Sequence, residues 1–436
     1  MKQFALTLLA KILKKLAALT IARYKPSIVG ITGNVGKTST RDAVETVLRT
    51  ERKIRSSSKN FNNELGLPLT ILGSWESTEG GLFFWCGVII TSIKNILTEQ
   101  KDFPEIIILE YGVDRPGDMG YLLEIAEPQI GIVTAVGDIP VHVEFFTGPE
   151  GVAKEKAKLI ERIPAIGFAI LNADDTYVAK MKQHTRGHAI TYGFRDDADM
   201  KITNFSSYLD SEKGDAGITF KLSYGGNTVP IKIKGMLGKT GAYASAAAAI
   251  VGLTFGINFT KIAELLQNYN GPAGRLRVIP GIKNTTIIDD TYNAAMKSMI
   301  EALDTLKSIK PKRAIAVLGD MLELGKYTLE AHEAVGKQAA RSVDLLLTVG
   351  MRGKIIAEGA ARAGMQKQKI FSFDTLDETT LFLEERMKKG DVVLVKGSQA
   401  VRMEKIVKTI MMSPGTAKDV LVRQSRVWLA KPGIYE

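Results

Sequence analysis

The residues from Gly30 to Thr40, which read GITGNVGKTST, have the types and spacing of a phosphate-binding loop. An apolar run over residues 27–31 leads into the loop, and a helix-forming stretch begins at Lys37. In such a loop, backbone N–H groups and the helix N-terminus surround the anion, the lysine neutralises phosphate charge and the hydroxyl ligates Mg²⁺. The residues expected to contact the nucleotide are Gly33, Asn34, Val35, Gly36, Lys37, Thr38 and Ser39.

The spacing of this loop departs by one residue from the common GxxxxGK[ST] pattern. Ile31 occupies the first glycine position, and Gly30 lies one residue upstream. The glycines recur instead as GxxGxxGKT, which predicts an ATP or GTP site of a particular subtype.

Carboxylates stand at the ends of two other apolar runs. Glu110 ends the run over residues 106–110, and a hard carboxylate there suits Mg²⁺ beside a triphosphate. A solvated strand-end acid is the alternative. Asp289 and Asp290 end a second run, which would place two carboxylates near the domain interface. A simple helix cap is the alternative explanation for one of these aspartates.

Short apolar runs alternate with amphipathic stretches through the first half of the chain. We predict strands at 27–31, 106–110, 130–134 and 169–172 and helices at 37–49 and 151–162, the order typical of a parallel sheet with crossover helices. Residues 197–236 alternate in polarity around a Gly-rich turn and predict a small antiparallel β insertion. An alanine-rich helix is expected over 242–255.

The segment 270–274, which reads NGPAG, is the predicted domain boundary. A second α/β unit follows, with strands expected at 286–289, 313–318, 345–349 and 392–395, and without a GxGxxG loop. The predicted fold is α/β: an N-terminal helix (1–26), a central phosphate-loop domain with a parallel sheet (27–270) and a Rossmann-like C-terminal domain (271–436).

Composition restricts the class of protein. The chain has 436 residues, 45% hydrophobic and 24% charged, as in ordinary globular proteins. Its single cysteine, Cys86, excludes a disulfide framework and a multi-thiolate metal site. The net charge of +11 favours an anionic partner, but Lys and Arg are spread along the chain, so we expect no nucleic acid.

The first 22 residues combine leucines with interspersed lysines. The segment is too interrupted to span a membrane and has no clear cleavage site, so we predict a basic amphipathic helix. This helix either docks on the protein's own body or lies on an anionic membrane surface. The predicted location is the cytoplasm, with the inner membrane face as the alternative.

Five further segments accompany the loop in a fixed order. They read NNELGLP from Asn62, LNADD from Leu171, DDTYNA from Asp289, LGDMLELG from Leu318 and KGS from Lys396. With the GxxGxxGKT loop, the set resembles the Mur ligases and their folylpolyglutamate synthase relatives, and within that family the D-alanyl-D-alanine-adding branch. The similarity runs over residues 27–407.

This resemblance implies an ATP- and Mg²⁺-dependent, ADP-forming amide ligase. A carboxylate is a poor electrophile because its leaving group would be an oxide, so the family first converts it to an acyl phosphate. The implied partners are a UDP-linked muramoyl peptide and D-alanyl-D-alanine, joined by a monomeric enzyme during synthesis of peptidoglycan precursors.

The resemblance also assigns roles to residues. Thr38, Glu110 and His142 fall at Mg²⁺-binding positions, although the loop before His142 looks longer here. Lys156 falls where many relatives carry a carbamylated lysine, but Lys158 stands where an acid is usual. The implied catalytic residues are Lys37, Lys156, Asp290 and Asn293; Arg275 is expected at the nucleotide, and Asn62, Asn63, Asp320, Glu323 and Lys396 at the substrates.

Departures from the family pattern leave the substrates open. Thr240, Gly241 and Ala244 replace residues usual near the nucleotide, Ala295-Met296 replaces Asn-Pro, and the family's N-terminal nucleotide-sugar domain is missing upstream of the loop. Two alternatives follow. One is an ATP-dependent amino-acid ligase acting on another acceptor, and the other is a non-catalytic, membrane-associated nucleotide-binding protein.

Overall fold

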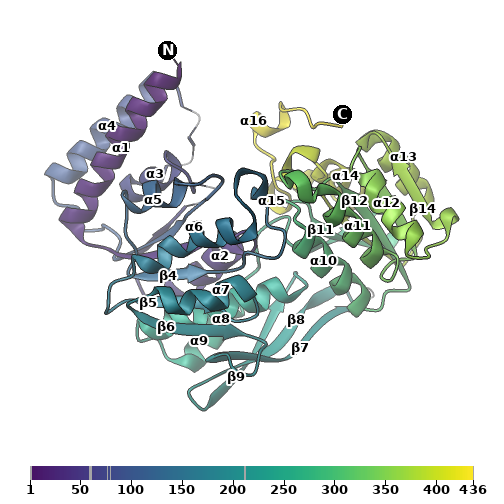
Figure 1. The fold of residues 1–436 in the computed structure, drawn as a ribbon, viewed down its shortest axis with the longest axis horizontal. Helices are drawn as coiled ribbons and strands as arrows, with labels where there is room; N and C mark the ends of the chain where they lie inside the picture. Colours follow the sequence, from purple (N-terminus) through teal and green to yellow (C-terminus); the bar gives the residue numbers. More distant parts are fainter. Residues whose placement is uncertain (1, 58–60, 76, 79, 211–212, 436) are drawn as a thin grey trace.

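Strand β1 (Ser27–Thr32) lies at the centre of the first of two β-sheets in a computed structural model that describes residues 2–57, 61–75, 77–78, 80–210 and 213–435 (Figure 1). It pairs in parallel with β3 (Ile106–Glu110) on one side and β4 (Ile130–Val133) on the other. Parallel strands present their carboxyl ends at one edge, so the loops after β1, β3 and β4 meet there.

The first sheet has the strand order β2-β3-β1-β4-β5-β6-β7-β8-β9. Its strands are parallel as far as β7 and antiparallel from β7 to β9. The remaining strands are β2 (Ile54–Ser56), β5 (Phe168–Asn172), β6 (His188–Gly193), β7 (Met200–Asp210), β8 (Asp215–Tyr224) and β9 (Asn227–Lys234).

Helices cover both faces of this sheet because its central strands are apolar on both sides. Val29 and Ile31 pack with α2 and α8, whereas Ile28 packs with α1, α3 and α5. The helices of this half are α1 (Lys2–Tyr24), α2 (Lys37–Leu48), α3 (Gly66–Leu72), α4 (Leu82–Leu97), α5 (Asp118–Leu123), α6 (Pro149–Glu161), α7 (Thr176–Lys180), α8 (Lys239–Thr254) and α9 (Phe259–Leu266).

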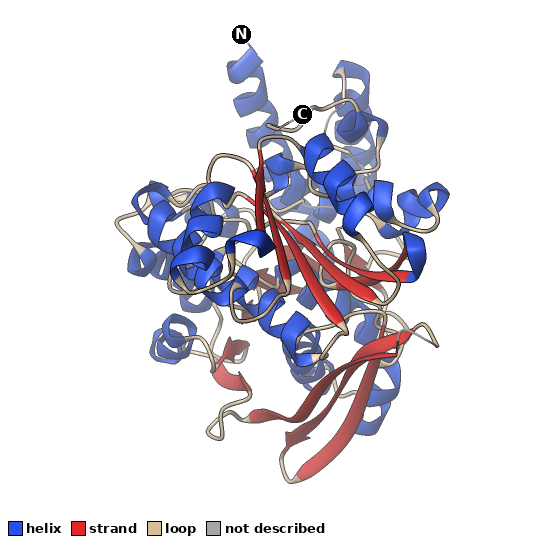
Figure 2. Cartoon of the chain, turned by 90° about the vertical axis from the view of Figure 1, so that its right-hand side faces the viewer, coloured by secondary structure: helices blue, strands red, loops and turns tan. Residues whose placement is uncertain are grey.

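The second sheet has the order β10-β11-β15-β12-β13-β14 and is parallel except for β10 at its edge (Figure 2). Its strands are β10 (Arg277–Gly281), β11 (Thr285–Asp290), β12 (Arg313–Gly319), β13 (Leu345–Val349), β14 (Ile370–Phe373) and β15 (Asp391–Lys396). Its helices are α10 (Met296–Ser308), α11 (Thr328–Ala339), α12 (Gly353–Arg362), α13 (Leu376–Arg386), α14 (Glu404–Ile410), α15 (Ala417–Val420) and α16 (Arg426–Leu429).

The predicted α/β fold is confirmed, and the structure changes one part of it. The antiparallel hairpins expected over residues 197–236 are present, but β7 pairs with β6 and so continues the main sheet instead of forming a separate insertion. The exposed apolar helix α4 was not predicted from the sequence.

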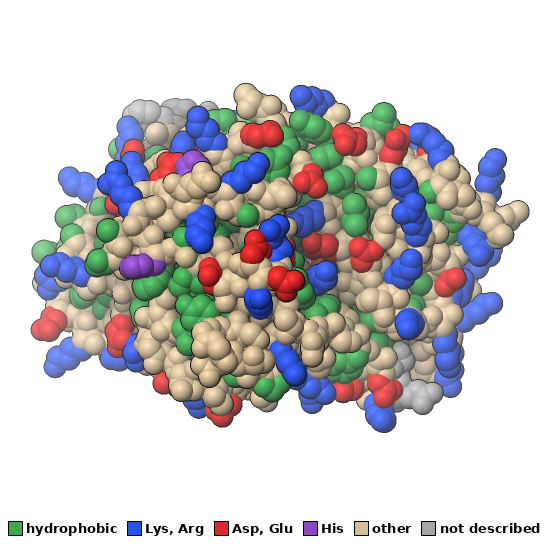
Figure 3. Space-filling model, turned by 60° about the horizontal axis from the view of Figure 1, so that its bottom comes forward, with side chains coloured by type: hydrophobic (Ala, Val, Ile, Leu, Met, Phe, Trp, Pro, Cys, Tyr) green, Lys and Arg blue, Asp and Glu red, His purple; other side chains and the backbone are tan. Residues whose placement is uncertain are grey.

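The basic N-terminal helix is present as α1, although residue 1 and the side chains of residues 2–4 lie outside the description. Its inner face docks on the body, with Leu13 and Leu16 buried against α3 and α4. Within the described residues, each helix is either too short or too polar to cross a bilayer. On the face that Figure 3 shows, Lys and Arg side chains are interspersed with Asp and Glu.

The contact between α2 and α8 predicts a stability effect. A Cβ added at Gly252 in α8 would lie 2.8 Å from Val47 of α2 and Ile262 of α9. We therefore expect Gly252→Val to lower the free energy of unfolding by about 1–3 kcal/mol, measured by urea unfolding.

Gly120→Ala in α5 is the matched control, because an added Cβ there meets nothing within 4 Å. This control is expected to be neutral or slightly stabilising. Equal unfolding midpoints for the two variants would contradict the close packing of α8.

Candidate active site

The phosphate-binding loop lies between β1 and α2 and depends on glycine for its shape. Gly33 has φ 141° and Gly36 has φ 93°, both in the region that favours glycine. A Cβ on Gly33 would come within 2.0 Å of Thr134 Oγ1. The Asn34 N–H donates to Ala135 O at 2.7 Å, and the Thr134 hydroxyl donates to Val35 O at 2.6 Å, so β4 holds the loop in place.

Two oxygen groups suited to Mg²⁺ lie close together, Thr38 at the start of α2 and Glu110 at the end of β3. Glu110 Oε2 accepts a 3.4 Å hydrogen bond from the Thr38 hydroxyl, and Glu110 Oε1 lies 2.8 Å from Arg41 Nη1, without hydrogen-bond geometry. The described residues form no cluster of three or more His, Cys, Asp or Glu side chains that would hold a metal by themselves. A carboxylate and a hydroxyl fit Mg²⁺, which completes its octahedron with water and nucleotide phosphate.

Two buried lysines approach the same cavity. Lys37 donates to Gly33 O at 2.6 Å, and burial lowers the pKa of its ammonium group. Lys156 of α6 is also buried, and burial together with the nearby positive charge of Lys37 lowers its pKa to about 7. Near neutral pH, Lys156 is therefore a neutral amine in a fraction of the protein molecules.

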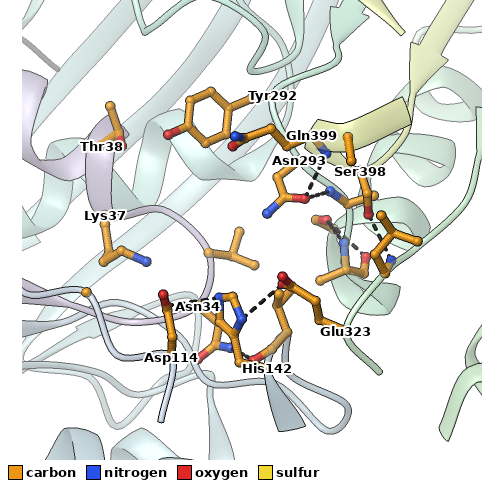
Figure 4. A pocket seen from close by; sticks show the side chains of 18 of the residues that line it. Asn34, Lys37, Thr38, Asp114, His142, Tyr292, Asn293, Glu323, Ser398 and Gln399 are labelled. Carbon is orange, nitrogen blue, oxygen red and sulfur yellow. Dashed lines mark hydrogen bonds and ion pairs between the residues drawn. The ribbon is translucent and has the colours of Figure 1, made fainter. Parts of the chain in front are cut away.

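His142 connects the two halves of the site. Its Nδ1 lies 2.9 Å from Glu323 Oε2, and its Nε2 lies 3.2 Å from Asp114 Oδ1 (Figure 4). The hydrogen bond from His142 lowers the pKa of the Glu323 carboxyl. His142 is thus in the predicted cavity, but its ring nitrogens face carboxylates of Asp114 and Glu323, and its role as a metal ligand stays a prediction.

The opposite wall comes from the second sheet. The Arg275 guanidinium lies 4.1 Å from the centroid of the Tyr292 ring, which fixes it beside the cavity. Asn293 Oδ1 accepts hydrogen bonds from the N–H groups of Ala294 and Gln399, at 2.9 and 3.4 Å. In Figure 4, Tyr292 and Asn293 lie across the open space from Lys37.

Asp290 and Lys396 form a fully buried ion pair behind this wall. They pair in register on β11 and β15, and Lys396 Nζ lies 2.7 Å from Asp290 Oδ2 and 2.9 Å from Asn293 O. Neither side chain lines the cavity, and Lys396 binds the main chain of Asn293. The direct roles of Asp290 in catalysis and Lys396 in substrate binding stay predictions. Burial raises the pKa of neighbouring Asp289 to about 6.

The remaining predicted substrate residues divide into two groups. Asn62 and Glu323 line the cavity, whereas Asn63 accepts from the Gly66 N–H and begins α3. Asp320 is buried, and its carboxylate accepts from the Gly353 N–H at 2.8 Å and the Tyr435 hydroxyl at 2.6 Å. In this conformation, the side chains of Asn63 and Asp320 bind backbone N–H groups of neighbouring segments.

The cavity that these residues line has a volume of about 500 Å³ and lies between the two sheets. The predicted residues that line it are Gly33, Asn34, Val35, Lys37, Thr38, Asn62, Glu110, His142, Lys156, Arg275, Asn293 and Glu323. Ser39 and Gly36 lie outside this lining, and Ser39 is buried in α2. The cavity brings the phosphate-loop residues, carboxylates and cations together in one site.

The C-terminal tail also lines the cavity, which the sequence analysis missed. Trp428, Lys431 and Ile434 line it, and Arg402 holds the tail by donating to Trp428 O at 3.0 Å. Glu404 pairs with Arg402 at 2.6 Å and with Arg423 at 3.0 Å. The charged residues and the tryptophan of this segment could have indicated a site in the sequence. Their contacts with the cavity could not be predicted, because the other cavity residues are distant along the chain.

A smaller recess opens on the other side of the loop. Val35, Thr240 and Tyr243 line it, together with Lys297 and Glu301 of α10. Thr240 is one of the residues that depart from the family pattern, whereas Ala244 is buried in α8. Of the departures, Thr240 therefore changes the surface beside the phosphate loop.

Comparison with known proteins gives the class. The family model for the Mur ligase middle domain matches residues 89–252, and that for the Mur ligase glutamate ligase domain matches residues 274–399. The chain belongs to the Mur ligase family, a family of ATP-dependent, ADP-forming amide ligases, so the resemblance inferred from the sequence is confirmed.

Within the family, the chain is similar to one kind of ligase. It is 28% identical to the UDP-N-acetylmuramoyl-tripeptide--D-alanyl-D-alanine ligase of Bacillus subtilis, over 92% of this chain and 79% of that protein. It is 31% identical to the Mycobacterium leprae ligase of the same name, over 96% and 77%. The structure of MurF ligase from Thermotoga maritima with ADP matches at 25% identity and a TM-score of 0.74, covering 92% of this chain and 82% of that one.

The pairing of Glu110 with Thr38 generates a prediction about metal. Glu110→Gln removes one negative charge but keeps the shape of the side chain, so we expect ATP hydrolysis or ligation to fall at least about 100-fold and to need more Mg²⁺. Turnover measured over a Mg²⁺ titration tests this.

Glu105→Gln is the control, because Glu105 precedes the same strand and is exposed. It should leave the Mg²⁺ dependence unchanged. A Glu110→Gln enzyme with the original turnover at the original Mg²⁺ concentration would exclude Glu110 from metal binding.

Proposed function

We propose that this protein uses ATP to join D-alanyl-D-alanine to a UDP-linked muramoyl tripeptide, the reaction named for its relatives. The observation that carries the proposal is the single cavity in which the phosphate loop, Glu110 and Lys156 face Arg275 and Asn293. This arrangement fits amide synthesis, because activation of a carboxylate and attack by an amine take place on one acyl group. The same reaction places the enzyme in peptidoglycan precursor synthesis.

The first step transfers the γ-phosphoryl group of ATP to the acceptor. A carboxylate oxygen attacks the γ-phosphorus, the bond to the bridging oxygen breaks and ADP leaves. Lys37 and the loop N–H groups stabilise the charge that develops on the phosphate oxygens. Thr38 and Glu110, with His142 as a further candidate, would hold Mg²⁺, whose chemistry here is to neutralise phosphate charge.

The second step forms the amide. The amine of the incoming dipeptide attacks the acyl carbon, the C–O bond to phosphate breaks, and the amine loses a proton. We infer that Asn293, Glu323 and the tail residues orient this amine, since they form the wall opposite the phosphate loop. The assigned units, residues 27–270 and 271–436, would close on each other to complete the site.

We propose that the nucleotide base lies at the recess beside the loop, which would have to widen because it encloses only about 30 Å³ in this structure. Tyr243, Lys297 and Thr240, the last a departure from the family pattern, offer it polar groups. We further propose that the enzyme acts as a monomer in the cytoplasm and contacts the inner membrane face through its N-terminal helix. The interspersed lysines of α1 support this contact.

Ligation by purified protein tests the proposed reaction. With ATP, Mg²⁺, UDP-linked muramoyl tripeptide and D-alanyl-D-alanine, we expect ADP, phosphate and amide product in equal amounts, detected by mass spectrometry. Lys37→Ala should abolish all three products, because the loop loses its cation.

Different outcomes separate the alternatives. Product formed with glutamate but not with the dipeptide would replace the proposal with another amino-acid ligase. ATP binding without ADP release for any acceptor and amine would support a non-catalytic role.

The buried amine of Lys156 generates a prediction about pH and bicarbonate. Above about pH 7 the neutral amine attacks CO₂, forms an N–C bond and releases a proton, which leaves a carbamate anion beside the metal-binding residues. Below that pH most of the lysine is protonated, and only the small neutral fraction reacts. We therefore expect activity to rise as pH increases through 7, and to rise further with added bicarbonate at the lower pH.

Lys156→Arg keeps the positive charge but cannot form this carbamate, so it should lose activity and its response to bicarbonate. Lys154→Arg, on an adjacent exposed position of α6, should retain both. Isotopically labelled bicarbonate that gives no protein-bound carbamate signal in the original enzyme would contradict the assignment.

A further inference from the structure

Helix α4 presents an apolar stripe to solvent. Phe83, Cys86, Ile90, Ile93 and Leu97 recur at spacings of three and four residues, so they share one face of the helix. All five are exposed, with Phe83 at 92%, Ile90 at 67% and Leu97 at 76%. The opposite face is buried at Val88 and Ser92, so the stripe is the side of α4 that the protein body leaves uncovered.

Helix α1 extends this apolar surface. Tyr24 at the end of α1 donates hydrogen bonds to Asn95 O and Thr98 O at the end of α4, so the two packed helices run in the same direction. In Figure 1 they project together from the body, far from the second sheet. The exposed apolar side chains of α1 are Leu6, Leu8, Ile12 and Leu19.

The concentration of these side chains is unusual for the described part of the chain. It has 18 exposed large apolar side chains, and nine of them lie on α1 and α4, which together contribute 39 of the 436 residues. Scattered exposed leucines need no explanation, but a contiguous apolar surface marks an interaction site. We call these nine residues and Cys86 the α1–α4 surface.

The charges on the two helices themselves have one sign. Neither helix contains Asp or Glu, whereas Lys11, Lys15, Arg23 and Lys94 are exposed on them. Lys14 differs, because it pairs with Glu124 of the body. Exposed cations beside an apolar face complement a surface that is apolar inside and anionic at its boundary.

We propose that the α1–α4 surface docks into the headgroup region of an anionic lipid bilayer. The inference deepens the membrane contact proposed for α1, and it identifies α4 as the principal inserted element. Aromatic and aliphatic side chains on α4 enter the acyl boundary, while the lysines stay at the level of the phosphates. Neither helix crosses the bilayer, in agreement with the hydropathy of the described helices.

Docking would also place the active site close to the membrane. Phe61 packs with Leu13 and Leu16 under α1, and the next residue, Asn62, lines the catalytic cavity. The middle of α1 is therefore connected to the cavity through Phe61 and Asn62. An acceptor or product at the membrane surface would have a short path to this cavity.

Cys86, the sole cysteine, provides a direct measurement on the stripe. A polarity-sensitive fluorophore on Cys86 of the full chain should shift to shorter wavelength with vesicles of phosphatidylglycerol and phosphatidylcholine, and spin-labelled lipid should quench it. Phosphatidylcholine vesicles should give a smaller change. Phe83→Glu with Ile90→Glu should weaken binding at least about tenfold, because charged groups replace inserted apolar ones.

Two control variants separate insertion from general effects. Ile166→Glu with Leu381→Glu changes two equally exposed apolar residues elsewhere, at 85% and 62%, and should bind as the original chain does. Lys11→Glu with Lys15→Glu should remove the preference for anionic vesicles. Ligation with soluble substrates and no vesicles should be unchanged in all these variants, so failure of docking is distinguishable from failure of the proposed reaction.

Two results would overturn the inference. One is a fluorophore that spin-labelled lipid does not quench on any vesicle. The other is a spectral shift without vesicles that follows protein concentration and accompanies dimer formation in light scattering, since a second copy would then cover the surface.

Discussion

The position of β1 between two parallel strands is the constraint on which the site depends. It places the glycine loop after β1 directly between Glu110 of β3 and Thr134 after β4. One neighbour places a carboxylate beside the loop, and the other fixes the loop through its hydroxyl group. The proposed phosphate and metal sites are therefore consequences of one strand order, and the helices pack on the two faces of the sheet that carries them.

The second sheet holds the polar loop at Asn293 beside the cavity. The ion pair of Asp290 with Lys396 removes two charges from water, and that is favourable only with close geometry and further hydrogen bonds. Lys396 meets this requirement by also binding the main chain of Asn293. The tail adds a similar arrangement, in which Glu404 lies between Arg402 and Arg423. The wall opposite the phosphate loop thus rests on buried charge pairs that also bind main-chain oxygens.

Much of the fold followed from local patterns. The runs that become β3 and β13 were predicted to the residue, because buried parallel strands are continuously apolar and their ends are polar. The cavity residues from Gly33 to Glu110 followed from the loop motif and strand ends. Asp114, the tail and α4 were missed, because their roles depend on contacts across the chain. Lys396 was found by motif, but only the register of β11 with β15 showed that it points beneath the site.

The tail has a consequence for the order in which this protein matures. Residues 27–135 contain the strands and helix that form and hold the phosphate loop, and they emerge early during synthesis. Trp428, Lys431 and Ile434 emerge after both sheets, yet they form part of the cavity wall. A ribosome-bound chain can therefore form the phosphate loop before the cavity has its last wall. Completion of that wall is then the last property that the growing chain gains.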